Sequence, residues 1–150
     1  MDAHIDAVRV AGTPEGPVPV AVLAVDGEPE EVLPIFIGFD EATSIARGLE
    51  AVDIGRPLTH DLLLDVIEEL GGRIDRVEIS EITDDGTYIA DLHLNTPRSD
   101  VVIDARPSDS LALAARTNAP ISVAETVFES GRSDREQFDQ LDDIREVELT

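Results

Sequence analysis

An internal repeat constrains the fold of this 150-residue chain more than any other feature of its sequence. Shifting the sequence by 69 positions, without a gap, aligns residues 8–48 with residues 77–117, and seven of the 41 aligned pairs are identical. Each copy has a segment in which apolar and polar residues alternate, then a second strand-like segment, a third apolar segment and a helical pattern. Because alternation is typical of half-buried strands, the sequence predicts a duplicated strand–strand–strand–helix unit.

The expected strands lie at 5–10, 18–25 and 32–37 and at 77–82, 87–94 and 101–105, the helices at 40–50 and 108–117, and short apolar segments at 52–54 and 121–123. We therefore expect an α+β fold in which the duplicated units form a mixed or antiparallel sheet core with helices packed on it. The almost wholly apolar segment 18–25 is typical of a strand buried on both faces. It favours a homo-oligomer, either a dimer or a trimer.

Two further segments lie outside the repeat. Residues 59–70 carry an apolar stripe at helical spacing, which predicts a docked amphipathic helix with Thr59 as its N-cap. After residue 130 the sequence becomes more charged, and a capping-box pattern at 133–136 predicts a short, loosely docked helix. We therefore divide the chain into a domain at 1–130 and a charged C-terminal tail at 131–150.

The charge of the chain is strongly one-sided, since 33 Asp and Glu oppose only 11 basic residues, all of them Arg, for a net charge of −22. This composition is typical of halophilic proteins, because at ~1 M salt the Debye length is about 3 Å and self-repulsion is screened. An acidic surface that binds a cationic partner is the alternative. In concentrated salt the net charge does not exclude a nucleic-acid substrate. With no membrane segment and no signal peptide expected, we predict a cytoplasmic protein.

A charged group follows the last strand of the second copy. Asp104 and Arg106 are two residues apart, so on a strand both would project from one face. In the gapless alignment they match Ile35 and Ile37, which indicates that the fold itself does not require their charges. Asp109 follows in the first turn of the next helix, where it could serve as a cap.

The same region carries a family resemblance. Arg-Pro-Leu-Thr-His-Asp-Leu-Leu at 56–63, Asp-Ala-Arg-Pro-Ser-Asp-Ser-Leu-Ala-Leu-Ala at 104–114 and Ala-Pro-Ile at 119–121 resemble the signature blocks of the bifunctional nuclease family. The segment Pro-Ile-Phe-Ile-Gly at 34–38 is also similar to family members, and the resemblance covers about residues 1–128. It implies nuclease activity toward both DNA and RNA.

The residues in these blocks suggest roles in phosphodiester hydrolysis. The candidate catalytic residues are His60, Asp104, Arg106 and Asp109, the candidate substrate-binding residues Arg56 and Arg98, and the candidate metal ligands Asp104, Asp109 and Asp61. Carboxylate oxygens suit Mg²⁺ or Mn²⁺, Arg binds phosphate in bidentate fashion, and His exchanges protons near neutral pH. No organic cofactor is expected.

Other readings remain open. The charged cluster could instead serve a non-catalytic oligomeric module that binds an anion or a protein partner. A serine hydrolase is disfavoured, because Ser108 and Ser110 lie near no evident His–Asp pair. His4 and His93 fall on predicted strands, and we interpret them as ordinary surface or edge residues.

Overall fold

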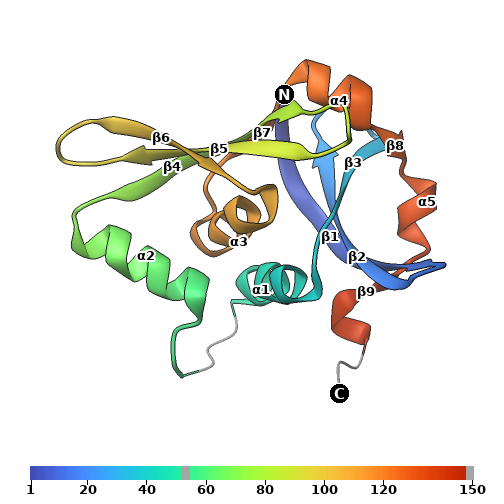
Figure 1. Ribbon diagram of the computed structural model, residues 1–150, viewed down its shortest axis with the longest axis horizontal. Helices are drawn as coiled ribbons and strands as arrows, with labels where there is room; N and C mark the ends of the chain where they lie inside the picture. The colour runs from blue at the N-terminus through green and yellow to red at the C-terminus, as the bar shows by residue number, and fades with distance from the viewer. Residues whose placement is uncertain (52–54, 148–150) are drawn as a thin grey trace.

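The computed structural model describes residues 1–51 and 55–147, so the apolar segment expected at 52–54 lies outside the described residues (Figure 1). In chain order the elements are β1 (Asp2–Thr13), β2 (Gly16–Val25), β3 (Glu31–Phe36), α1 (Phe39–Glu50), α2 (Thr59–Glu69), β4 (Arg73–Ile82), β5 (Tyr88–Asn95), β6 (Asp100–Ala105), α3 (Pro107–Thr117), β7 (Ile121–Val123), α4 (Glu125–Gly131), β8 (Ser133–Asp134), α5 (Glu136–Asp139), β9 (Asp142–Asp143) and the 3₁₀ turn η1 (Ile144–Glu146). The predicted α+β fold is confirmed, with β1–β2–β3–α1 and β4–β5–β6–α3 as its two units.

The two units share one sheet, in the strand order β6-β5-β4-β7-β1-β2-β3-β8, with β9 paired to β1. Within each unit the neighbouring strands are antiparallel. The short strand β7 joins the units, because it runs parallel to β4 and antiparallel to β1. The sheet is therefore mixed, and α1 and α3 lie side by side beneath it (Figure 1).

The gapless repeat misplaces the third strand by one residue. Ala21 on β2 pairs with Ile35, but the matching Ala90 on β5 pairs with Ala105. Asp104 is thus one position out of the register that the alignment implied, and alternate strand positions face opposite sides of a sheet. The match between Asp104 and an isoleucine was therefore wrong, and it says nothing about what the fold tolerates there.

Strand β2 is buried on both faces by this chain alone. One face of β2 packs in the main core, between the sheet and α1. The other face, with Val20 and Val22, packs on Val32 of β3 and on Phe138 of the C-terminal segment. Phe138 is only 7% exposed, so this segment packs more closely than the loose docking that we predicted. The tail, and not a partner subunit, supplies the second burial. The boundary at residue 130 and the oligomeric state stay predictions.

Two predicted helix caps were wrong. Helix α2 begins at Thr59 and is preceded by Leu58, whose backbone N–H donates to the Asp61 carboxylate at 3.1 Å. Helix α5 begins at Glu136, and Ser133 lies in β8, paired with β3.

Helix α2 is also less docked than its apolar stripe predicted. Leu64 and Ile67 contact the core, but Leu62, Val66 and Leu70 are exposed and none of the helix's described residues is fully buried. Within the described ranges, none of the helices has the length and apolarity needed to span a membrane.

Candidate functional site

The two sequence blocks that we singled out meet where α1, α2 and α3 approach one another (Figure 1). His60, in the first turn of α2, and Asp109, in the first turn of α3, lie 2.9 Å apart between Nε2 and Oδ1. Their side chains are 12% and 35% exposed, so the contact is partly shielded from water. We call the surrounding residues the helix-junction cluster: Ser44, His60, Asp61, Arg106, Asp109 and Arg116.

The second ring nitrogen of His60 contacts α1. Its Nδ1 lies 2.6 Å from the hydroxyl of Ser44, and Arg116 Nη2 donates to the same hydroxyl oxygen at 3.1 Å. If the hydroxyl donates to Nδ1, the ring proton lies on Nε2 and donates to Asp109, so every polar atom in this chain of contacts is satisfied. The neutral imidazole therefore fits this arrangement.

Arg106 closes the solvent side of the cluster. Its Nε donates to Asp109 Oδ2 at 2.9 Å, its Nη2 to Oδ1 at 3.3 Å and its Nη1 to Glu41 at 3.3 Å. Burial alone would raise the pKa of Asp109, but hydrogen bonds from Arg106 and His60 outweigh it and hold that pKa below its ordinary value. The Arg106 side chain is 66% exposed, so its guanidinium remains accessible to a ligand.

The two acidic partners of Arg106 are equivalent in the duplicated fold. Gly38 precedes α1 and Arg106 precedes α3, and Glu41 and Asp109 each follow three residues later. Asp109 therefore corresponds to Glu41 and not to the Asp40 of the gapless alignment. Neither helix has a side-chain cap at its start, so the predicted capping role of Asp109 was wrong.

Arg116 anchors the cluster from the buried side. This 9%-exposed side chain donates to Asp61 at 2.7 Å and to the backbone oxygens of Ser44 and Ala112 at 3.0 and 2.9 Å. Burial would raise the pKa of Asp61, but the bonds from Arg116 and Leu58 lower it below its ordinary value. Arg116 thus ties α2 to both other helices.

A groove of about 740 Å³ opens beside this anchor, between α2, the end of α1 and the second unit. Arg47, Arg73 and Arg116 are among its lining residues, together with Leu64 and Ile67. The carboxylates of Asp61, Asp65 and Glu68 line the same groove, and Asp61 is paired with Arg116. The positive charges of the groove are therefore balanced by acidic neighbours.

The remaining predicted site residues lie elsewhere. Asp104 is exposed on β6, opposite Asp91 on β5, and Arg106 turns away from it toward the helices. Arg56 is exposed just before α2, and Arg98 is exposed in the turn between β5 and β6. Among residues 1–51 and 55–147, the three carboxylates predicted to bind metal, those of Asp104, Asp109 and Asp61, do not gather into one group. Asp61 and Asp109 instead contact arginines.

Sequence reasoning missed Ser44, Glu41 and Arg116. The sequence analysis considered Ser108 and Ser110 beside a His–Asp pair but not Ser44, which contacts His60 while His60 contacts Asp109. No local pattern identifies Ser44, since its contact depends on where the first turn of α2 lies against α1. The repeat gave no valid signal for Arg116, because the register of the two helices aligns it with Gly48 and not with Arg47.

Comparisons with known proteins agree with the resemblance. The family model described as the bifunctional nuclease domain matches residues 21–136. The chain is 37% identical to the uncharacterized protein Rv1829 of Mycobacterium tuberculosis over 127 residues, which are 85% of this chain and 73% of that protein. It is 27% identical over 110 residues to a protein named bifunctional nuclease 2 from Oryza sativa, covering 71% of this chain and 34% of the plant protein. The chain belongs to the bifunctional nuclease domain family.

Proposed function

We propose that this protein hydrolyses phosphodiester bonds of RNA, DNA or both, and that the helix-junction cluster is where the reaction takes place. The observation that carries the proposal is the 2.9 Å contact between His60 and Asp109. It joins two blocks of sequence that are 49 residues apart, and Arg106 extends the contact to solvent. The names of the plant relatives, bifunctional nuclease 2, support the same class of reaction.

Arg106 is assigned to phosphate binding. A guanidinium has five N–H groups, and three of those of Arg106 donate to Asp109 and Glu41. The other two are available on an exposed side chain, and Arg binds phosphate oxygens well through paired N–H groups. The two carboxylates would hold the guanidinium in one orientation, so less side-chain freedom is lost when a phosphate binds.

Proton transfer is assigned to His60. The lowered pKa of Asp109 makes this carboxylate a poor proton acceptor, so its role is to hold Arg106 and His60 in place. Imidazole is the side chain that ordinarily exchanges protons near neutral pH. Water attack on the phosphorus needs a proton acceptor, and the departing oxygen needs a proton donor. His60 can serve as the donor: with a proton on both ring nitrogens, it gives its Nε2–H to the departing oxygen and becomes neutral, while the attacking water releases its proton to solvent.

A divalent cation, Mg²⁺ or Mn²⁺, belongs to the proposal as an activator. Such an ion would neutralise charge on the phosphoryl oxygens and on the leaving oxygen. We also propose that the protein is adapted to concentrated salt, where the repulsion between its −22 charge and a nucleic acid is screened. The assay must therefore include molar KCl.

The test is cleavage of end-labelled single-stranded RNA and DNA by the pure protein in molar KCl, with Mg²⁺ or Mn²⁺ and with a chelator. Arg106→Gln should slow cleavage by about 100-fold, as expected for losing a donor to a charged phosphate. Arg132→Gln is the matched control, because Arg132 is also a half-exposed arginine with an acidic partner, Glu31. Cleavage that is unchanged in Arg106→Gln would overturn the assigned site.

One further observation favours a second candidate, an oligomeric binding or regulatory module. The apolar side of α2 is exposed at Leu62, Val66 and Leu70, which is typical of a surface that contacts another protein chain. A homo-oligomer, either a dimer or a trimer, fits this candidate. It is favoured if no condition gives cleavage while light scattering finds an assembly that Leu70→Glu dissociates.

A further inference from the structure

We propose that Glu78, Asp91 and His93 bind a divalent transition-metal ion on the sheet face opposite the helices. The three residues lie on β4 and β5, where Glu78 pairs with Asp91 and Arg76 pairs with His93. Asp91 and His93 are two positions apart on one strand and so project from the same face. Each offers one potential ligand atom, and these atoms all lie within 4.8 Å of one another.

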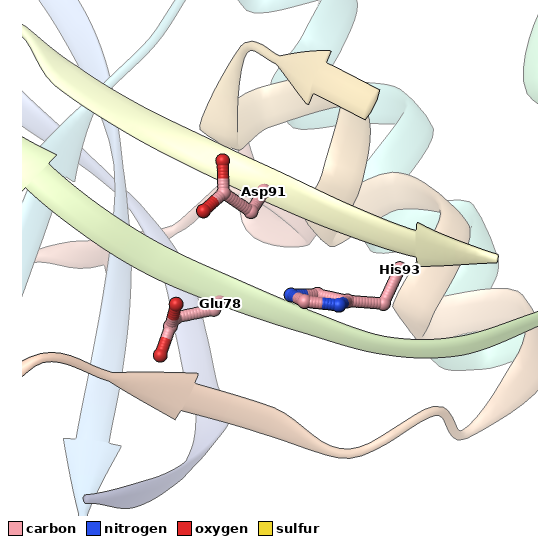
Figure 2. Close-up of side chains that lie close together, drawn as sticks. All are labelled: Glu78, Asp91 and His93. Atoms are coloured by element: carbon pink, nitrogen blue, oxygen red, sulfur yellow. The ribbon is translucent and has the colours of Figure 1, made fainter. Parts of the chain in front are cut away.

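Figure 2 shows this arrangement in the structure. The His93 ring extends along the strands toward the two carboxylates, with a nitrogen at its leading end, and Glu78 and Asp91 flank the space that it points into. Ligand atoms in a metal site lie about 2.0–2.2 Å from the ion. Small side-chain rotations would therefore bring all three around one cation.

The site is separate from the helix-junction cluster. The neighbouring residues Val77 and Ile79 on β4 and Leu92 and Leu94 on β5 point into the main core, toward α3. Because side chains alternate along a strand, Glu78, Asp91 and His93 must face the other side of the sheet. The nuclease proposal makes no use of these residues.

Two unpartnered polar atoms give independent support. His93 Nε2 is fully shielded from solvent and has no hydrogen-bond partner in the structure. Ser122 Oγ, on β7, is in the same state, and Ser122 pairs in register with Glu78. Buried polar atoms without a partner are uncommon in folded proteins, because they lose their hydrogen bonds to water and form no hydrogen bond within the protein. A cation bound at His93 Nε2 would give one of these two unpartnered atoms a ligand.

The donor set indicates the kind of ion. One imidazole nitrogen with two carboxylate oxygens suits Zn²⁺ or Mn²⁺, whereas Mg²⁺ and Ca²⁺ prefer oxygen ligands alone. Two carboxylates also balance the charge of a divalent ion. Asp104 lies one strand further, opposite Asp91, and adds another negative charge on this face.

The experiment is calorimetric titration of the full chain with Zn²⁺ and with Mn²⁺, in molar KCl and excess Mg²⁺ to suppress weak binding to surface carboxylates. We expect one tight site per chain, and His93→Gln, Asp91→Asn and Glu78→Gln should each weaken it by about 100-fold. His4→Gln is the matched control, because His4 is an exposed histidine on β1. Thermal unfolding without metal checks that each variant is folded.

Two results would overturn the proposal. One is the absence of a tight site in the wild-type chain. The other is binding that His93→Gln leaves as tight as it was, which would assign the ions to surface carboxylates. The nuclease proposal fails separately, because Arg106→Gln should reduce cleavage and leave metal binding unchanged.

Discussion

The contact between His60 and Asp109 can be measured by a double-mutant cycle, with His60→Ala and Asp109→Ala made singly and together. Each single variant changes more than the contact, since His60→Ala leaves a space and Asp109→Ala removes one of 33 acidic residues from a crowded surface. The cycle cancels these separate effects and leaves only the coupling between the two side chains.

The size of the coupling follows from the geometry. A hydrogen bond to an ionised carboxylate stabilises a protein by about 1.5–3 kcal/mol, and this one has a length of 2.9 Å. His60 is largely buried, but about a third of Asp109 is exposed, so water competes for the carboxylate. We therefore expect a coupling free energy of about 1.5–2 kcal/mol, at the lower end of that range.

The assay is urea-induced unfolding in molar KCl, where the Debye length is about 3 Å and distant charges contribute little. The exposed pair Arg132 and Glu31, 3.4 Å apart, is the control, and its coupling should be at most about 0.5 kcal/mol. A His60–Asp109 coupling no larger than that of the control would refute the reasoning. The two side chains would then be neighbours without an energetic link.

Three further predictions concern pH, the C-terminal segment and salt. The pKa of Asp109 is lowered in the folded protein, so the ionised carboxylate stabilises the fold above its unfolded pKa near 3.8, and this stabilisation is lost as the pH falls through the folded pKa. The difference in unfolding free energy between wild type and Asp109→Asn should therefore shrink below about pH 4. A difference that stays constant with pH would contradict this prediction. Phe138→Ala should cost about 3–5 kcal/mol in urea unfolding, against about 0.5–1 kcal/mol for the exposed Phe36→Ala, and equal costs would mean that the tail is not part of the core. The melting temperature should rise as KCl is increased from ~0.1 M to ~1 M, because screening relieves the repulsion of a −22 chain, and a flat curve would argue against adaptation to salt.

The order of the elements could be predicted from the sequence because it depends on local patterns. Apolar alternation and helical spacing identified both strand–strand–strand–helix units, and β7 was expected as a short apolar segment. The alignment placed Asp104 one residue out of register, because the sequence of a single strand does not determine which residues of its neighbour it pairs with. Only the sheet fixes it, through the turn that joins the strands.

The site was predicted in part, for the same reason. The signature blocks pointed to His60, Arg106 and Asp109, and these three do meet. The placement of the first turn of α2 against α1 decided that Ser44 completes the chain of contacts, and nothing in the sequence around Ser44 encodes that placement. His93 was interpreted as an ordinary residue, because the metal site that we propose needs Glu78, which comes from another strand.

The placement of β7 has a consequence for how this protein is made. Strand β1 is synthesised before the second unit, and within the described residues its backbone pairing reaches that unit through the short strand β7. During synthesis the first unit can form hairpins, but its free β1 edge has to wait for some hundred residues of further translation. Shielding of that edge, by a chaperone or by rapid elongation, should therefore govern the yield of native protein in cells.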